Sequence, residues 1–253
     1  PVIGSHADLE AASVADAKAF FAEWYVPQNV SLVVAGDFDP STTKLLIEQY
    51  FGGLVRAATD PLRKEPPVEA KLNGVTRETL SDSVTLARTT MAWLSPKLYA
   101  PGDAELDVIA TVLSDGKASR LYKALVYDNK LAQDVSAYQS SKALASHFVV
   151  EVSARPGVSL DTIEAAIDAE LAKLRDEPIT EAELNRAKNQ YEAGFIQRMQ
   201  SLSTRASLLN TYYAHHNNPG YAATDLHRYL NVTKAVLNPD ARVILRVEPK
   251  DDK

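Results

Sequence analysis

The sequence predicts an α+β fold in which a mostly antiparallel sheet is flanked by helices. From residue 75 onward, strand-like and helix-like segments follow one another in the order ββααββαα, and more helix and a final strand come after them. A helix-and-strand block at 13–40 returns in shorter form at 231–247, which indicates two copies of one structural unit. Because the first copy starts at its closing helix and strand, we expect only its C-terminal remnant in residues 1–55.

We expect the first copy to hold two helices and one buried strand. Ser13 and Asp16 form a capping pattern for a helix. Its apolar stripe is aromatic and consists of Phe20, Phe21 and Trp24. The β-branched run Val30–Ala35 is typical of a strand covered on both faces, and the helix after it ends near Phe51. The strand would belong to a sheet of its own, and self-association or the second copy would cover the aromatic stripe.

A linker is predicted between the two copies. Residues 56–74 contain Asp60-Pro61 and Pro66-Pro67 and show no hydrophobic periodicity, which is typical of an extended connection. The predicted organisation is therefore a C-terminal remnant of the first unit at 1–55, a linker at 56–74 and a second unit at 75–253.

The second unit is predicted to alternate pairs of strands with pairs of helices. Strands are expected at 75–80, 83–94, 133–141, 146–154 and 243–247. Helices are expected at 103–113, 121–126, 160–174 and 180–199. Asp103 is placed to cap the first of these helices, and Thr180 with Glu183 forms a capping box for the last.

The composition is that of a folded protein and excludes several kinds of site. Of the 253 residues, 45% are hydrophobic and 24% are charged, close to the average of globular domains. The net charge of -6 includes no basic run, so we expect no nucleic-acid partner and no membrane partner. Cysteine is absent, which excludes disulfides and cysteine-ligated metals and leaves both periplasm and cytoplasm open for a soluble chain.

The five histidines form no zinc motif. No H-x-x-E-H segment and no two histidines four residues apart occur, so no helix presents two imidazoles to one metal ion. His215 and His216 are adjacent and would point about 100° apart on a helix, as at a polar helix end. Phosphate-loop and serine-hydrolase motifs are absent too. We expect no catalytic residue, no metal ligand and no cofactor in this chain.

Six segments together resemble one known family. In chain order they read VIGS (2–5), SVADAKAFFAEWYVPQNVSLVVAGDFDP (13–40), LYAPGD (98–103), KASRLY (117–122), LAQ (131–133) and ARPG (154–157). This ordered set, which covers nearly the whole chain, resembles the pitrilysin/insulinase family of zinc metallopeptidases. The resemblance is to bacterial members and to their non-catalytic, inactive type of domain.

The resemblance implies a duplicated metallopeptidase-like unit and a role in proteolysis. In that family each half pairs two similar α+β units, and two halves close like a clamshell around a chamber in which a peptide is cut. The zinc motif and its downstream Glu ligand belong to the part of the first unit that would precede this chain. Zinc is therefore expected in a missing catalytic unit. The implied partners are that zinc-bearing unit or a partner half, and a peptide substrate.

The chain departs from the family at the substrate grip. Members that hold substrate opposite the zinc use an Arg and a Tyr seven residues apart, after the S-R-L helix. Val126 and Gln133 stand at those positions here. Gln133 is the one candidate substrate-binding residue, since its amide could contact peptide where relatives offer a phenol; alternatively it only lines the chamber. A second departure is the short segment 234–238, where family units place a full helix.

Three functions follow from these observations. The favoured one is the non-catalytic portion of a zinc metalloendopeptidase, which forms chamber wall and scaffold for the missing zinc-bearing unit. The alternative is a catalytically silent structural subunit, similar to the processing-peptidase-like core proteins of respiratory cytochrome complexes, because one fold serves both roles. An unrelated binding module would need a pocket of convergent polar groups. An H-x-x-E-H motif in the complete gene would decide for the peptidase.

Overall fold

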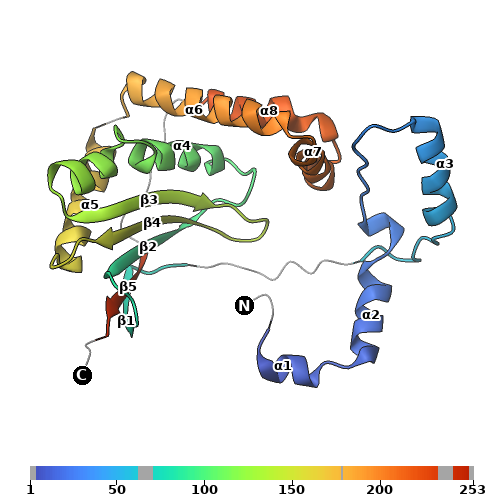
Figure 1. The fold of residues 1–253 in the computed structure, drawn as a ribbon, viewed down its shortest axis with the longest axis horizontal. Coiled ribbons are helices and arrows are strands. Elements are labelled where there is room, and N and C mark those ends of the chain that lie inside the picture. Colours follow the sequence, from blue (N-terminus) through green and yellow to red (C-terminus); the bar gives the residue numbers. More distant parts are fainter. Residues whose placement is uncertain (1–3, 62–70, 178, 233–241, 251–253) are drawn as a thin grey trace. The chain divides into compact units, whose positions relative to one another are not determined.

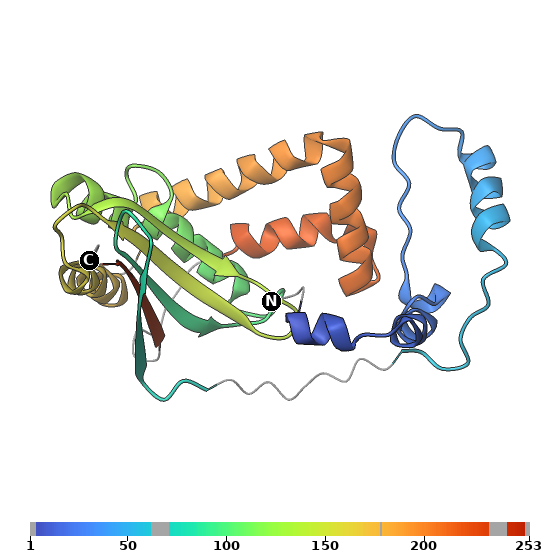
Figure 2. The same cartoon turned by 60° about the horizontal axis from the view of Figure 1, so that its bottom comes forward.

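The chain forms two compact units, each built from two stretches of sequence (Figures 1 and 2). The structure is a computed structural model that describes residues 4–61, 71–177, 179–232 and 242–250. The first unit consists of Pro1–Lys64 and Ile196–Ala223, and the second of Glu65–Phe195 and Thr224–Lys253. Compactness does not test which residues descend from which copy, so the predicted remnant, linker and second unit stay a prediction.

The described part of the first unit is helical. Its elements are α1 (His6–Ala11), α2 (Val14–Trp24), the 3-10 turn η1 (Pro27–Asn29), α3 (Pro40–Phe51), the end of α6 (Glu181–Gln200), α7 (Leu202–His216) and the 3-10 turn η3 (Pro219–Tyr221). The capping prediction for α2 is confirmed. The Asp16 backbone N–H donates to the Ser13 hydroxyl at 3.2 Å, and the Ser13 N–H donates to the Asp16 carboxylate at 2.9 Å. These bonds satisfy two N–H groups that a helix start leaves open.

The strand predicted at Val30–Ala35 is wrong, and no second sheet occurs among the described residues. Val30 and Leu32 are 59% and 56% exposed. A strand is completed by backbone hydrogen bonds to a neighbouring strand, and in the described chain none reaches this run. Phe20 and Phe21 of α2 are also more than half exposed. The first unit does not bury these two rings by itself, and burial of the stripe by self-association or by the second copy stays a prediction.

A single five-stranded sheet forms the base of the second unit. Its strands are β1 (Val75–Asp82), β2 (Arg88–Ser95), β3 (Ala132–Ser140), β4 (Ser146–Ala154) and β5 (Arg242–Pro249). They lie in the order β1-β5-β2-β4-β3, in which β1 and β5 are parallel and every other pair is antiparallel. The mostly antiparallel sheet and the β3–β4 hairpin are confirmed. The second strand begins at Arg88 rather than Ser83.

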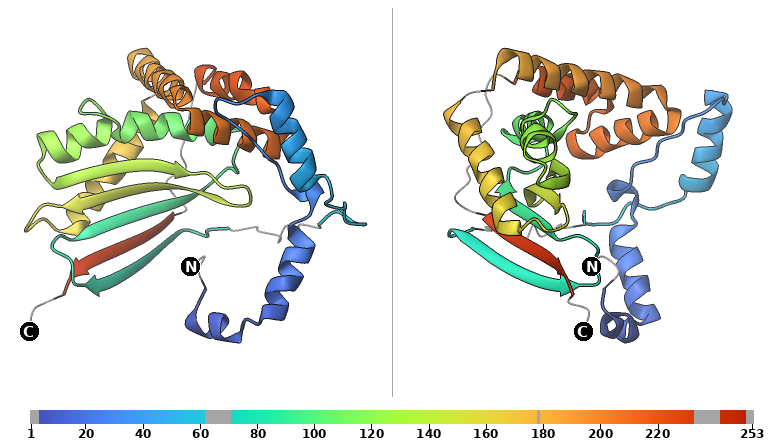
Figure 3. Two further views of the ribbon diagram at one scale, coloured as in Figure 1. Left: turned by 45° about the vertical axis from the view of Figure 1, so that its right-hand side comes forward. Right: turned by 60° about the vertical axis from the view of Figure 1, so that its left-hand side comes forward.

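Two layers of helices cover one face of this sheet (Figure 3). The inner layer consists of α4 (Asp103–Ser114) and α5 (Leu160–Asp176). Its core contains Met91, Trp93, Ile109, Leu113, Phe148, Val150, Ile163 and Ile167. The other side of α4 packs on the first part of α6 and on α8 (Ala222–Leu230). That second cluster includes Ala104, Val108, Val112, Ala187 and Tyr229. α4 is therefore buried between the sheet and the outer helices.

The start of α4 corrects one prediction. Gly102, not Asp103, is the capping residue, and it adopts a φ of 94°. A Cβ at this position would lie 2.9 Å from the Pro96 Cγ, so glycine fits the turn for two reasons. Asp103 is the first helical residue, and its carboxylate accepts the backbone N–H of Tyr99 at 2.9 Å. The carboxylate thus fixes the loop before the helix instead of capping it.

The helix expected through Leu121 and Leu125 is a π-helix, η2 (Tyr122–Asp128). The wider turn is visible in its exit, where the Asn129 N–H donates to the Ala124 carbonyl at 3.2 Å. π-Turns of this kind are frequent at functional sites. The shortened helix expected at 234–238 lies outside the described residues.

Ion pairs attach α5 to the sheet. The buried Glu164 accepts hydrogen bonds from the Thr89 hydroxyl at 3.1 Å and from Arg246 Nε at 2.6 Å and Nη2 at 2.8 Å. Glu164 is 3% exposed, so this carboxylate is stabilised by its donors rather than by water. α5 is held in place over β2 and β5.

Candidate functional site

Gln133 lies in a β-bulge at the start of β3. Ala132 is opposite Ala154 and Asp134 is opposite Ser153, so Gln133 is the extra residue between two regular pairs. Its side chain is exposed. β3 is the last strand in the sheet order, so beyond β4 it has no second strand neighbour among the described residues. The edge is partly occupied, because the Ala137 N–H donates to the Ser114 hydroxyl of α4 at 2.7 Å and that hydroxyl donates to the Ala137 carbonyl at 3.3 Å. The bulge therefore stands at one end of a strand edge that α4 covers at Ala137.

The register places polar side chains on the sheet face opposite α4 and α5. Thr90, Glu151 and Ser136 are cross-strand neighbours on β2, β4 and β3. Tyr138 is 41% exposed on the same face, and its hydroxyl donates to the Glu151 carboxylate at 3.2 Å. Partial burial and the adjacent Glu151 carboxylate both raise the pKa of Tyr138, so the phenol stays a hydrogen-bond donor. This face can offer hydrogen bonds to a ligand.

A pocket lies at the end of η2, before β3. We call it the corner pocket; it has a volume of about 590 Å³ and is lined by Tyr122, Val126, Tyr127, Asp128, Lys130 and Arg155. The backbone N–H of Arg155 donates to the Leu131 carbonyl at 2.9 Å, and its Nε donates to the Ala132 carbonyl at 3.1 Å. Arg155 is thereby fixed beside the bulge. Val126 lines the pocket, while Gln133 follows the strand residue that Arg155 contacts.

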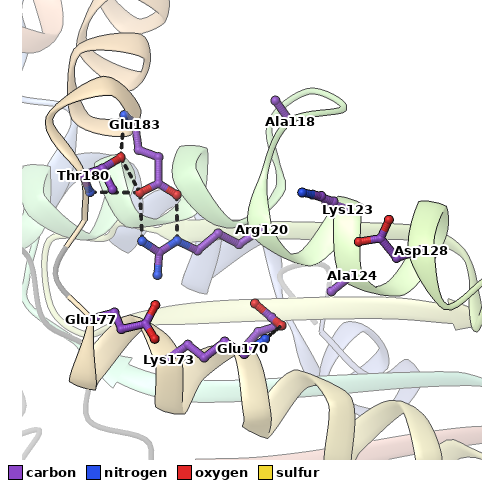
Figure 4. A pocket seen from close by; sticks show the side chains of 10 residues that line it. All are labelled: Ala118, Arg120, Lys123, Ala124, Asp128, Glu170, Lys173, Glu177, Thr180 and Glu183. Atoms are coloured by element: carbon purple, nitrogen blue, oxygen red, sulfur yellow. Dashed lines mark hydrogen bonds and ion pairs between the residues drawn. The ribbon is translucent and has the colours of Figure 1, made fainter.

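The S-R-L segment lines a second pocket, whose walls carry charges of both signs (Figure 4). This charged pocket has a volume of about 480 Å³ and lies between 118–128, the end of α5 and the start of α6. Arg120 donates from Nε and Nη2 to the two oxygens of Glu183, at 2.7 and 2.8 Å. The Arg120 guanidinium lowers the pKa of Glu183 to about 2. Glu183 also accepts the Thr180 N–H at 2.9 Å, which confirms the predicted capping box.

The arrangement in the charged pocket has a structural role. Arg120 and Glu183 saturate each other, and Lys173 pairs with Glu170 at 2.6 Å. A bidentate pair between the S-R-L segment and α6 fixes η2 relative to the helices. The Arg120–Glu183 pair of this pocket therefore positions the neighbouring corner.

A buried acidic group joins α4 to α8. Arg228 Nη2 donates to Asp103 at 2.8 Å, and the Tyr229 hydroxyl donates to Asp107 Oδ2 at 2.8 Å. Burial is the main reason that the pKa of Asp107 rises to about 6, with the nearby Asp103 carboxylate adding to the rise. The cluster is enclosed between helices, and it has the geometry of a packing contact that depends on pH.

Metal ligands do not gather in the described part of the chain, where no three His, Cys, Asp or Glu side chains could hold one ion. His215 and His216 lie at the end of α7 with ring centroids 6.5 Å apart, and the His216 ring stacks on Tyr221. The described helices also include none that is both long and apolar enough to cross a bilayer.

The sequence profile of the peptidase M16 inactive domain matches residues 11–191. The chain belongs to this family. The family assignment agrees with the resemblance found in the sequence, and the match extends across both the helical N-terminal region and most of the sheet.

Relatives of this M16 inactive domain are bacterial proteins named as zinc proteases. It is 27% identical to the zinc protease PqqE of Helicobacter pylori over 230 residues, 89% of this chain and 51% of that protein. It is 24% identical to an uncharacterized zinc protease of Mycobacterium tuberculosis, over 97% of this chain and 56% of that protein. The chain thus spans about half the length of the curated relatives it matches.

Solved structures confirm the fold. A protease from Helicobacter pylori superposes with a TM-score of 0.81 at 24% identity, covering 98% of this chain and 62% of that one. A peptidase M16 inactive domain from Pseudomonas fluorescens superposes with a TM-score of 0.80 at 18% identity, with 98% and 60% coverage. At these identities the likeness concerns the fold alone.

Sequence reasoning found Gln133 but missed the residues around it. Lys130 and Arg155 were part of matched or neighbouring segments, LAQ and ARPG, and had no assigned role. Their signal was a pair of cations flanking a hairpin, with Lys130 before β3 and Arg155 after β4, but only the register of the two strands brings them to one pocket. The structure does not bring Gln133 into contact with any catalytic group of the described chain.

Proposed function

We propose that this M16 inactive domain is the non-catalytic portion of a zinc metalloendopeptidase. It forms part of the wall of a peptide chamber and a scaffold for a zinc-bearing unit. Support comes from the family, from relatives that carry zinc-protease names and are about twice as long, and from the lack of a metal cluster in the described residues.

The observation that carries the scaffold role is the exposed apolar run in the first unit. Val30, Leu32, Val33 and Val34 are 59%, 56%, 41% and 43% exposed and belong to no sheet. Burying one such side chain contributes roughly 1.5–3 kcal/mol. An extended β-branched run with free backbone groups is suited to pair with a strand of another unit. In the proposal that other unit carries the zinc.

The wall role rests on the part of the β3 edge between the bulge and Ala137, which no second strand of the described chain occupies, and on the polar face of the sheet. Strand edges bind extended peptide through backbone hydrogen bonds, a mode that tolerates varied side chains. Gln133 stands at the end of this edge, where its amide either contacts peptide or solvates the wall. Hydrolysis would use a zinc-activated water supplied by the missing unit.

The test uses this chain and the zinc-bearing unit produced as separate polypeptides. Mixed together, they should form a complex that contains one zinc and hydrolyses peptides, while this chain alone should contain no tightly bound zinc after chelator washing. Leu32→Asp should weaken the complex by at least tenfold, because it places a charge in the apolar run that the proposal buries in the complex. Gln49→Asp, an exposed polar position on α3, is the matched control.

Two results would contradict the proposal. If the isolated chain binds as much zinc as the complex does, the proposal that the other unit carries the zinc is wrong. A complex that forms but has neither zinc nor hydrolysis would favour the silent structural subunit instead.

A further inference from the structure

We infer that the corner pocket binds a carboxylate of the peptide that lies along β3, either its C-terminal carboxylate or an Asp or Glu side chain. The inference rests on the proposed function for the identity of the peptide. The binding site itself is inferred from the arrangement of Lys130, Arg155 and the tyrosines that line the pocket with them.

The first step is the charge of the pocket. Lys130 and Arg155 contribute two positive charges and Asp128 one negative charge. Neither cation forms an ion pair with a carboxylate within the described chain. In contrast, Arg120 and Arg228 each have carboxylate partners at 2.7–2.8 Å. The pocket therefore keeps a net charge that suits one carboxylate, and Asp128 disfavours a more highly charged anion.

The second step is the fixed position of the guanidinium. Arg155 is half-buried, and its Nε is engaged by the Ala132 carbonyl. The two terminal nitrogens, Nη1 and Nη2, have no hydrogen-bond partner among the described residues and share the end of the planar group. These two nitrogens can donate parallel hydrogen bonds to the two oxygens of a carboxylate. Because one edge is already held, little side-chain freedom remains to be lost on binding.

The third step is the fixed position of Lys130. Its backbone has a φ of 52°, in the left-handed region, which ends the π-helix and turns the chain toward β3. The neighbouring N–H of Leu131 donates to the Leu125 carbonyl at 2.8 Å, and that of Asn129 donates to Ala124. The turn is held on both sides of Lys130, so its backbone is fixed beside the pocket and its exposed side chain can bring the ammonium to the rim.

The fourth step is the place of the pocket. Arg155 contacts the carbonyl of the residue before the bulge, so the pocket lies beside the short part of the β3 edge that precedes Ala137, where Ser114 of α4 occupies the edge. A peptide whose end pairs with this short stretch would bring that end, or a side chain near it, to the two cations. Tyr122 and Tyr127 add aromatic surface for the group that carries the carboxylate.

The experiment measures binding of labelled octapeptides to the isolated chain by fluorescence anisotropy. Three peptides of one apolar sequence are compared: a free C-terminal carboxylate, a C-terminal amide, and the amide with one internal Glu. We expect the amide to bind at least fivefold more weakly than the free acid. Recovery by the internal Glu would assign the site to side chains, and no recovery would assign it to the terminus. Weaker binding of the free acid at high salt is expected as well.

Variants then assign the effect to the pocket. Lys130→Asn removes the charge, and Asn tolerates the left-handed backbone. This variant should bind the free-acid peptide about fivefold more weakly than the wild type and bind the amide peptide equally well. Lys123→Gln, an exposed lysine of the same π-helix, is the control and should change neither. Arg155→Lys keeps one charge but loses the bidentate end, and it should weaken the free acid about tenfold. Circular dichroism checks that each variant is folded.

Equal binding of free acid and amide, or equal loss with Lys123→Gln, would overturn the inference. These outcomes are separate from the proposed function. If the zinc-dependent complex cuts peptides but the isolated chain binds free acid and amide equally, the proposed function stands and the carboxylate site is refuted. If the isolated chain binds the carboxylate but the complex contains no zinc and hydrolyses no peptide, the carboxylate site stands and the proposed function is refuted.

Discussion

Replacing Asp107 by Asn should make the second unit more stable, and the gain should appear only above pH 4. The Asp107 carboxyl lies between α4 and α8, where it accepts the Tyr229 hydroxyl at 2.8 Å. Burial raises its pKa from 3.8 to about 6. This rise in the pKa corresponds to about 3 kcal/mol of unfolding free energy.

The direction of the effect follows from the protons that each state binds. Below pH 3.8 the Asp107 carboxyl is protonated in both the folded and the unfolded chain, so it does not change the balance. Between pH 3.8 and 6 the unfolded chain releases this proton while the folded chain keeps it. The free energy of unfolding therefore falls through this window and is lower by a constant amount above pH 6.

The assay is urea unfolding followed by far-UV circular dichroism at pH 4, 5, 6, 7 and 8. Asn is neutral at every pH and keeps an oxygen for the Tyr229 hydroxyl. Asp107→Asn should match the wild type at pH 4 within about 1 kcal/mol and exceed it by up to about 3 kcal/mol at pH 8. Asp115→Asn, at the exposed end of the same helix, should show no such trend. A wild-type-to-variant difference that stays constant from pH 4 to 8 would refute the reasoning.

Three further predictions concern the ion pairs and the bulge. Glu183→Gln should lower the free energy of unfolding by about 1–3 kcal/mol at pH 7, because Arg120 loses its bidentate partner; since the pKa of Glu183 is lowered to about 2, this difference should vanish as pH falls from 4.5 toward 2. Glu164→Gln should cost about 3 kcal/mol by urea unfolding, whereas Asp161→Asn, an exposed partner of the same arginine, should cost less than about 1 kcal/mol. In the zinc-bearing complex, Gln133→Ala should leave KM and kcat unchanged if Gln133 only solvates the wall; a clear rise in KM would make it a substrate contact.

Local signals in the sequence predicted the local structure well. The capping boxes at Ser13 and Thr180 involve residues three positions apart, and both form as expected. The hairpin of β3 and β4 was also predictable, because alternation and turn residues act over short distances. These features need nothing from the rest of the molecule.

The wrong predictions concern segments whose structure depends on residues far away in the sequence. Val30–Ala35 has the composition of a buried strand, but composition does not supply the neighbouring strand that pairing requires. The parallel pairing of β5 with β1 and the π-turn of η2 are set by tertiary contacts. The same limit explains why Gln133 was found through a family pattern, while Arg155 became a candidate only once the register placed it beside the bulge.

The position of β5 has a consequence for how this protein is made. β5 is inserted between β1 and β2, and it is translated after every other strand of the sheet. Until Arg242 and the residues after it leave the ribosome, β1 has no partner and β2 has one bare edge. Such late, non-local pairing slows folding and leaves apolar strands open to aggregation. We therefore expect chaperones to bind the incomplete sheet during synthesis and to dissociate once β5 has paired with β1 and β2.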